Sequence, residues 1–187
     1  MDNIVLIGFM GSGKTGVGRE LAKLLSIPFY DLDEMLAQEA GMPIPEIFRQ
    51  EGEEGFRRRE SGLLTRLAQE KQKNTSTAVY STGGGIVTRK ENLPLLKKLG
   101  TVVFFKVNPG TVLERVGDGT SRPMLAGSGR EKRVRELMLL RTPMYLACAD
   151  IVLAMDGYSK EENALRTKIV LQEHGCLQQA ARRISNE

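Results

Sequence analysis

The chain is poor in the residues that build zinc sites and disulfide frameworks. Its 187 residues include two cysteines, Cys148 and Cys176, and one histidine, His174. A structural zinc site takes four cysteine or histidine ligands, and a disulfide scaffold takes several paired cysteines. We therefore expect neither, and free thiols fit a reducing compartment such as the cytoplasm.

Long apolar segments are missing as well. No run of hydrophobic residues approaches the ~20 residues that cross a bilayer. The first expected strand begins within three residues of Met1, which leaves no room for a signal peptide. The sequence thus predicts a cytoplasmic protein without membrane contact. Its length predicts one domain over residues 1–175, followed by a flexible tail over 176–187.

The charge balance is modestly basic, with a formal net charge of +4 and a pI near 9.1. Nucleic-acid-binding proteins often carry such an excess, but no basic run here is interleaved with aromatic residues that could grip a single strand. Many arginines stand singly beside loops, where the phosphates or carboxylates of small molecules would account for them. We expect no nucleic-acid partner and, without coiled-coil heptads, a monomer.

Apolar strand-like and helix-like segments alternate along the whole chain. This alternation predicts an α/β fold, a three-layer αβα sandwich around a five-stranded parallel sheet. Ser159 and Glu162 have the spacing of a capping box. The expected strands are near residues 3–8, 27–32, 77–82, 101–107 and 150–155, and the expected helices are near 14–25, 33–40, 44–50, 53–71, 90–98, 109–116, 130–146 and 159–173.

The most informative segment is the octet Gly-Phe-Met-Gly-Ser-Gly-Lys-Thr at residues 8–15. It follows an apolar run and precedes an amphipathic stretch, which is the strand, loop and helix context of a P-loop. Its glycines allow backbone N–H groups to surround phosphates. Lys14 can reach the β- and γ-phosphates, and the Thr15 hydroxyl can ligate Mg²⁺. The octet predicts a nucleotide site but not a reaction.

Two further features would complete a kinase site. Asp31 and Asp33 end the second expected strand, where period-two alternation would turn both carboxylates the same way. One could hold the water shell of the metal and the other accept a proton, although Asp33 could also serve as a helix N-cap. The glycine-rich segment 117–129, which contains Arg122, is typical of a mobile lid.

Two more segments predict an anion-binding pocket. Arg57 and Glu60 are three residues apart on one expected helix, so Glu60 could orient the guanidinium toward a bound anion. The run Gly83-Gly84-Gly85 follows a buried strand and could approach a ligand closely, with a flexible turn as the alternative.

Together these segments resemble shikimate kinase, a small P-loop kinase. The family pattern runs from the P-loop through Asp-x-Asp, Gly-Glu-x-x-Phe-Arg-x-x-Glu, Gly-Gly-Gly and Arg-Pro-Leu-Leu to Arg-x-x-x-Tyr. Here it corresponds to residues 8–15, 31–33, 52–60, 83–85, 122–125 and 141–145. Met124 replaces the usual Leu of the lid motif, and residues 155–159 lack the proline that often covers adenine.

The resemblance implies transfer of the ATP γ-phosphate to the 3-hydroxyl of shikimate, with Mg²⁺ as cofactor and with ATP and shikimate as partners. It makes Asp33 the group that orients the nucleophile and can deprotonate it. Arg57 and Arg141 would hold the shikimate carboxylate. Including the backbone of the triple glycine, the implied substrate-binding residues are Asp33, Arg57, Gly83, Gly84, Gly85 and Arg141.

On the nucleotide side, the resemblance implies that Thr15 ligates Mg²⁺ directly and Asp31 does so through water. Arg122 would meet the phosphates from the lid, and Arg115 would lie against adenine. The implied catalytic residues are Lys14, Asp33 and Arg122, and the implied ATP-binding residues are Gly11, Ser12, Gly13, Lys14, Thr15, Gly16, Arg115 and Arg122.

Two other functions stay open at this point. A gluconate kinase on the same fold would explain the P-loop, the lid and Asp33, but it would not need both Arg57 and the triple glycine. A nucleotide-dependent regulatory protein that contacts nucleic acid through its basic surface would predict slow ATP hydrolysis and salt-dependent binding.

Overall fold

The computed structural model describes residues 2–72, 76–116 and 129–177. Within them, five strands form one all-parallel sheet in the order β2-β3-β1-β4-β5. The strands are β1 (Ile4–Ile7), β2 (Phe29–Asp31), β3 (Val79–Ser81), β4 (Thr101–Lys106) and β5 (Ile151–Ala154). The helices are α1 (Lys14–Leu25), α2 (Leu32–Ala40), α3 (Ile44–Glu70), α4 (Asn92–Leu99), α5 (Pro109–Val116), α6 (Arg130–Cys148) and α7 (Lys160–Glu173), with a 3₁₀ turn η1 (Ile86–Thr88).

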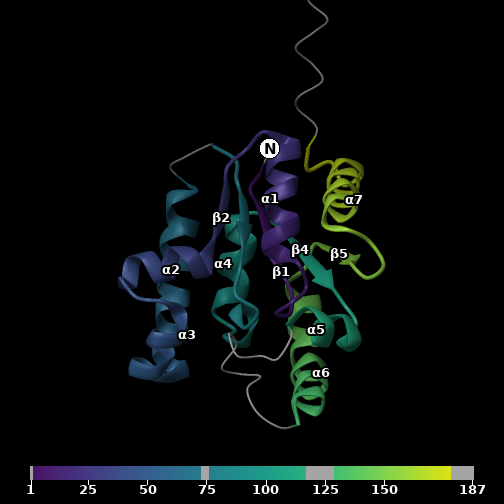
Figure 1. The fold of residues 1–187 in the computed structure, drawn as a ribbon. Helices are drawn as coiled ribbons and strands as arrows, with labels where there is room; N and C mark the ends of the chain where they lie inside the picture. Colours follow the sequence, from purple (N-terminus) through teal and green to yellow (C-terminus); the bar gives the residue numbers. More distant parts are fainter. Residues whose placement is uncertain (1, 73–75, 117–128, 178–187) are drawn as a thin grey trace, which may run out of the picture.

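Helices cover both faces of the sheet (Figure 1). The side chains of β1 alternate between two apolar clusters, and both sets are buried, as a central parallel strand requires. Ile4 and Leu6 enter the cluster made with α1, α5, α7 and the first part of α6. Val5 and Ile7 enter the cluster made with α2, α3, α4 and the end of α6. The three-layer αβα sandwich predicted from the sequence is therefore confirmed.

The predicted elements all form, but one boundary was wrong. The sequence placed Asp31 and Asp33 on one strand, whereas β2 ends at Asp31 and α2 begins at Leu32. Asp31 is the N-cap of α2, and its side chain accepts a hydrogen bond from the Asp33 N–H at 3.0 Å. The N-cap alternative therefore falls on Asp31 rather than Asp33. Period-two alternation does not apply across this capped turn.

Local signals explain two other boundaries. Gly52 has φ 70° and ψ −178° inside α3, and this break separates the two helical segments that the sequence predicted. The predicted capping box is confirmed, because the Ser159 hydroxyl accepts from the Glu162 N–H at 3.1 Å and the Glu162 carboxylate accepts from the Ser159 N–H at 2.8 Å.

The structure also bears on the expected tail, the cysteines, the membrane and the lid. Cys176 and Leu177 pack against the apolar cluster around α7, so ordered packing continues past residue 175. Both cysteines are free thiols. No helix among residues 2–72, 76–116 and 129–177 is long and apolar enough to cross a bilayer. Most of the predicted lid, residues 117–128, lies outside the described residues.

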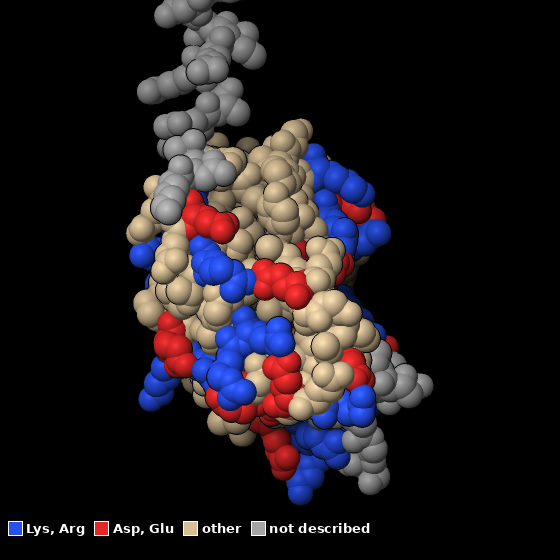
Figure 2. All heavy atoms as spheres, turned by 90° about the vertical axis from the view of Figure 1, so that its left-hand side faces the viewer, with Lys and Arg blue, Asp and Glu red and all other residues tan. Residues whose placement is uncertain are grey.

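The face over α2 and α3 carries basic and acidic side chains side by side (Figure 2). Several of them form ion pairs at the surface, among them Arg59–Glu51 at 2.6 Å and Arg66–Glu39 at 2.5 Å. Such exposed pairs add little stability. On this face Arg59 and Arg66 each have an acidic partner, as on a surface of mixed charge.

Candidate active site

The P-loop follows β1 at the carboxyl edge of the sheet, where parallel sheets place ligands. Gly11 and Gly13 have φ values of 76° and 93°, in the region that favours glycine. Gly13 is the N-cap of α1 and makes no side-chain cap, so the N–H groups of the first turn remain available to an anion. The loop therefore has the backbone of a phosphate-binding site.

Lys14 is buried and its ammonium points back into the loop. It donates hydrogen bonds to the carbonyl oxygens of Gly8 at 2.8 Å and Phe9 at 3.0 Å. These bonds hold the ammonium at the mouth of the loop. The charge is thus already in place for a phosphate chain lying on the loop.

Oxygen atoms from three elements meet beside the P-loop. The Thr15 hydroxyl donates to the Asp31 carboxylate at 2.7 Å, and the Ser81 hydroxyl lies 3.4 Å from the Thr15 hydroxyl. Within the described residues, no group of three histidine, cysteine, aspartate or glutamate side chains could hold a metal by itself. A hydroxyl and a carboxylate nevertheless fit Mg²⁺, which commonly takes one or two protein oxygens beside phosphates and water.

The Asp33 carboxylate lies against the first glycine of the triple-glycine segment. A Cβ at Gly83 would lie 3.0 Å from Asp33 Oδ1 and 2.6 Å from Glu60 Oε1. Glu60 is completely buried, and its Oε1 has no hydrogen-bond partner. Gly83 is therefore a glycine because two carboxylates occupy the space that a side chain would need.

Arg57 packs against the third glycine. A Cβ at Gly85 would lie 2.1 Å from Arg57 Nη2, well inside any permitted contact. Arg57 is buried, and its Nη1 donates to Glu60 Oε2 at 2.7 Å. Its Nε is buried without a hydrogen-bond partner. A buried guanidinium with spare donors suits a carboxylate ligand.

Arg141 and Tyr145 reach the middle glycine from α6. Arg141 Nη1 donates to the Gly84 carbonyl oxygen at 3.3 Å, and the Tyr145 hydroxyl donates to the same oxygen. Burial raises the pKa of Tyr145, so its phenol stays a donor. On its other side, a Cβ at Gly84 would lie 2.9 Å from the backbone N of Met10 in the P-loop. The triple-glycine segment therefore packs between the P-loop and α6, which argues against the flexible turn considered as the alternative.

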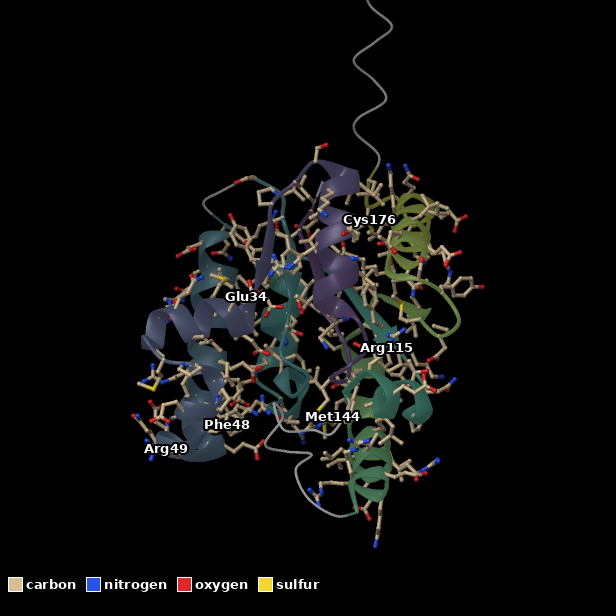
Figure 3. The ribbon with its side chains drawn as sticks, viewed as in Figure 1. Glu34, Phe48, Arg49, Arg115, Met144 and Cys176 are labelled. Carbon is tan, nitrogen blue, oxygen red and sulfur yellow. The ribbon has the colours of Figure 1, made fainter. Side chains whose placement is uncertain are left out.

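One cavity of about 250 Å³ joins most of these groups. Arg115 borders it as well, and its Nη1 donates to the Gly11 carbonyl oxygen at 3.3 Å from α5 (Figure 3). Arg57 and Arg141 do not line the cavity. Arg141 contacts Gly84, which does, and Arg57 packs against the next glycine, Gly85. Arg122 lies outside the described residues. The lining residues are Met10, Gly11, Gly13, Lys14, Thr15, Gly16, Asp31, Asp33, Thr82, Gly84 and Arg115.

Some contacts of the site were missing from the sequence-based prediction. The sequence pairs Arg57 with Glu60 through helical spacing but gives no sign that Glu60 touches Gly83. Tyr145 stands in the family pattern, yet its bond to Gly84 joins residues 61 positions apart. The sequence signal for both contacts was the unusual run of glycines, because glycines in such a position often mark a place where another group packs closely against the backbone.

Glu60 makes the site sensitive to pH. Burial raises the pKa of Glu60 from 4.5 to about 7, against the opposing charge of Arg57 and with some help from Asp33. We expect anion binding at Arg57, and kcat/KM with it, to fall as the pH drops below about 7, because a protonated Glu60 holds Arg57 less firmly. A pH profile from about 5.5 to 8.5 checks this, and Glu60→Gln should remove this limb.

The same group has the opposite effect on folding. Between pH 4.5 and about 7 the folded protein keeps a proton that the unfolded chain has lost, so the contribution of Glu60 to the free energy of unfolding falls as the pH rises. In the kinetic pH profile, a fall of kcat/KM at acidic pH that persists unchanged in Glu60→Gln would show that another group titrates.

The chain is similar to known proteins along most of its length. The family model described as Shikimate kinase matches residues 10–172. The shikimate kinase of Moorella thermoacetica is 46% identical over 167 residues, covering 89% of this chain and 91% of that protein. A solved shikimate kinase from Acinetobacter baumannii, in complex with shikimate, superimposes with a TM-score of 0.85 at 34% identity, with 96% of each chain covered.

A gluconokinase from Sinorhizobium meliloti superimposes with a TM-score of 0.51 at 16% identity over 95% of this chain and 97% of its own, which shows a shared fold alone. The family match and the relatives at 40–46% identity decide between the two kinases. The chain belongs to the shikimate kinase family.

Proposed function

We propose that this site transfers the γ-phosphate of ATP to the 3-hydroxyl of shikimate, with the P-loop as the nucleotide site and the triple-glycine segment as the wall between donor and acceptor. The single observation that supports it best is the packing of Gly83, Gly84 and Gly85. Gly83 lies against Asp33 and Glu60, and Gly85 lies against Arg57. Gly84 accepts hydrogen bonds from Arg141 and Tyr145 and also touches the P-loop. An acceptor held by the groups around the triple glycine would therefore lie next to phosphates held by the P-loop.

Phosphoryl transfer depends chiefly on positioning and on neutralising charge. The backbone of residues 11–16 and the Lys14 ammonium would surround the phosphates. When ATP binds, Lys14 would exchange its two carbonyl acceptors for phosphate oxygens. Arg115 and, from the lid, Arg122 complete the proposed nucleotide contacts.

The magnesium ion would be held by the Thr15 hydroxyl directly and by Asp31 through water. Both groups already lie within 2.7 Å of each other. The ion supplies charge neutralisation and orientation for the phosphates. Because Asp31 also caps α2, the residue that holds the metal water also fixes the position of Asp33 two residues later.

On the acceptor side, Arg57 and Arg141 are proposed to bind the shikimate carboxylate. Two guanidiniums suit a carboxylate because each can pair with it through two parallel hydrogen bonds. Asp33 is proposed to accept the proton of the attacking hydroxyl as the phosphorus–oxygen bond forms. Closure of the segment around Arg122 would exclude water as a competing acceptor.

A monomer in the cytoplasm, where ATP is available, completes the proposal. It needs neither nucleic acid nor a membrane. Fluorescence anisotropy with a labelled oligonucleotide at two salt concentrations tests the regulatory alternative, which requires strongly salt-dependent binding. A flat response removes that alternative.

The acceptor specificity is the first test of the function. In a coupled ADP-release assay with MgATP, we expect rapid turnover with shikimate and little or none with quinate, gluconate or AMP. AMP has no carboxylate for the two arginines to hold. Gluconate carries its carboxylate on an open chain, and quinate carries it on a saturated ring with an added hydroxyl, so each would place its hydroxyls differently, and a misplaced acceptor loses much of the rate. Turnover of another acceptor without shikimate would retain the P-loop chemistry and refute the substrate.

A further inference from the structure

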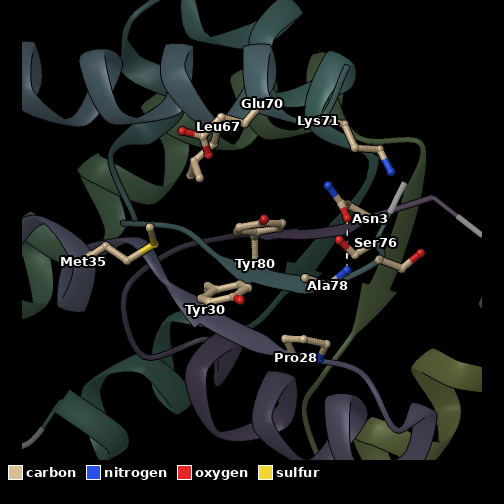
Figure 4. Close-up of a pocket in the computed structure, with 11 residues that line it drawn as sticks. Asn3, Pro28, Tyr30, Met35, Leu67, Glu70, Lys71, Ser76, Ala78 and Tyr80 are labelled. Atoms are coloured by element: carbon tan, nitrogen blue, oxygen red, sulfur yellow. Dashed lines mark hydrogen bonds between the residues drawn. The ribbon is translucent and has the colours of Figure 1, made fainter. Parts of the chain in front are cut away.

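A second cavity, of about 290 Å³, lies at the edge of the sheet between β2, β3 and the end of α3 (Figure 4). It shares no lining residue with the nucleotide cavity. Its apolar walls come from two tyrosine rings, Met35 and Leu67. Its volume is close to the lower end of the range for small-molecule sites.

The aromatic wall is a stacked pair. Tyr30 and Tyr80 are register partners on β2 and β3, and their ring centroids lie 5.4 Å apart with an interplanar angle of 25°. The ring of Tyr80 faces Tyr30 on one side and the cavity below Glu70 and Leu67 on the other (Figure 4). The face of an aromatic ring is electron-rich and attracts cations.

Among the described residues, the charged side chains around the cavity are Glu70, Lys71 and Asp2. Lys71 lines the cavity, but its ammonium is paired with the Asp2 carboxylate at 3.1 Å. Glu70 lines it as an exposed carboxylate, and no ion pair among the described residues involves it. Asn3 is committed to the backbone, since its amide donates to the Leu99 carbonyl and accepts from the Ala78 N–H, both at 3.0 Å.

The tyrosine next to Glu70 stays neutral. The pKa of Tyr80 is raised by its burial, by Tyr30 and by the negative charge of Glu70. Glu70 and Tyr80 both line the cavity, and the neutral ring adds no second negative charge at neutral pH.

We propose that this cavity binds a small organic cation, a protonated amine or guanidinium on an apolar body, with the cationic group between the Tyr80 ring and the Glu70 carboxylate. The apolar body would lie against Leu67, Met35 and the tyrosine pair. This site is separate from the phosphoryl-transfer site and does not depend on the roles proposed there.

Isothermal titration calorimetry of the full chain with three small aromatic probes of different charge tests the proposal. Benzylammonium should bind, uncharged benzyl alcohol should bind about fivefold to tenfold more weakly, and benzoate should not bind. Shikimate and ADP at saturation should leave the benzylammonium affinity unchanged, because the two cavities are separate. Equal affinity for benzylammonium and benzyl alcohol, or competition by shikimate and ADP, would overturn the proposal.

Two variants of the cavity test where the benzylammonium cation binds. Glu70→Gln should weaken benzylammonium about fivefold to tenfold while leaving benzyl alcohol unaffected, and Tyr80→Phe, which keeps the ring face, should retain binding. Glu136→Gln, at an exposed acid on α6, is the matched control and should change nothing. Full affinity in Glu70→Gln, or no binding of benzylammonium to the unmodified chain, would refute the assignment.

Discussion

Replacing Asp33 with asparagine is expected to lower kcat for shikimate phosphorylation about 10²–10⁴-fold, the range for loss of a general base. Asparagine has the same shape but cannot take up the proton of the attacking hydroxyl. The KM for ATP should change little, because Lys14 and the loop backbone hold the phosphates. Steady-state kinetics of Asp33→Asn, with both substrates varied, measures this.

A neighbouring carboxylate provides the control. Glu34 follows Asp33 in the first turn of α2, but its side chain is exposed and paired with Arg19 at 2.5 Å. Glu34→Gln should therefore leave kcat within about twofold, since exposed pairs contribute little. If Asp33→Asn retained most of its kcat, Asp33 would be restricted to positioning the acceptor, and the proton would have to leave by another route.

Replacing Gly85 with alanine is expected to raise the KM for shikimate about 10²-fold, with a smaller effect on kcat. The added Cβ would lie 2.1 Å from Arg57 Nη2, so the guanidinium must move away. Arg57 would then lose its place beside Glu60 and its proposed bond to the shikimate carboxylate, and a lost charge-assisted pair of this kind corresponds to such a change in affinity. Gly85 has φ −109°, so the backbone itself accepts alanine.

Gly62→Ala is the matched control for Gly85→Ala. Gly62 lies in α3, and a Cβ there would approach nothing closer than Arg66 Nη1 at 3.9 Å. This variant should bind shikimate normally and be slightly more stable, because alanine favours a helix interior. A thermal melt of both variants separates misfolding from loss of binding. A normal shikimate KM in folded Gly85→Ala would contradict the proposed role of Arg57.

The fold could be predicted because the local sequence patterns indicated the type of each helix and strand correctly along the chain. Alternating apolar runs located all five strands, and Ser159 with Glu162 marked the start of α7. The sequence did not show that Asp31, rather than Asp33, caps α2. A three-residue strand is too short for alternation to reveal where it ends.

The sequence named the residues of the candidate site but not the contacts between them. The sequence identified the P-loop, the two acids, the arginines and the triple glycine, and the structure places the described ones together. It gave no reason for three glycines, because that reason lies in Glu60, Arg57 and the Met10 backbone, which reach the segment only through tertiary packing. Such contacts between distant residues leave no local pattern.

The triple glycine also restricts how this enzyme can evolve. Gly83, Gly84 and Gly85 are each blocked by a different neighbour, so no single compensating substitution would make room for side chains at all three. Acquiring a side chain at position 85 requires giving up the present placement of Arg57, and with it the proposed grip on the carboxylate. A descendant that turned to an uncharged acceptor would be released from this constraint. We would therefore expect Gly85 to be lost only together with Arg57, as a linked mark of a changed substrate, whereas Gly84 would stay because the Met10 backbone blocks it.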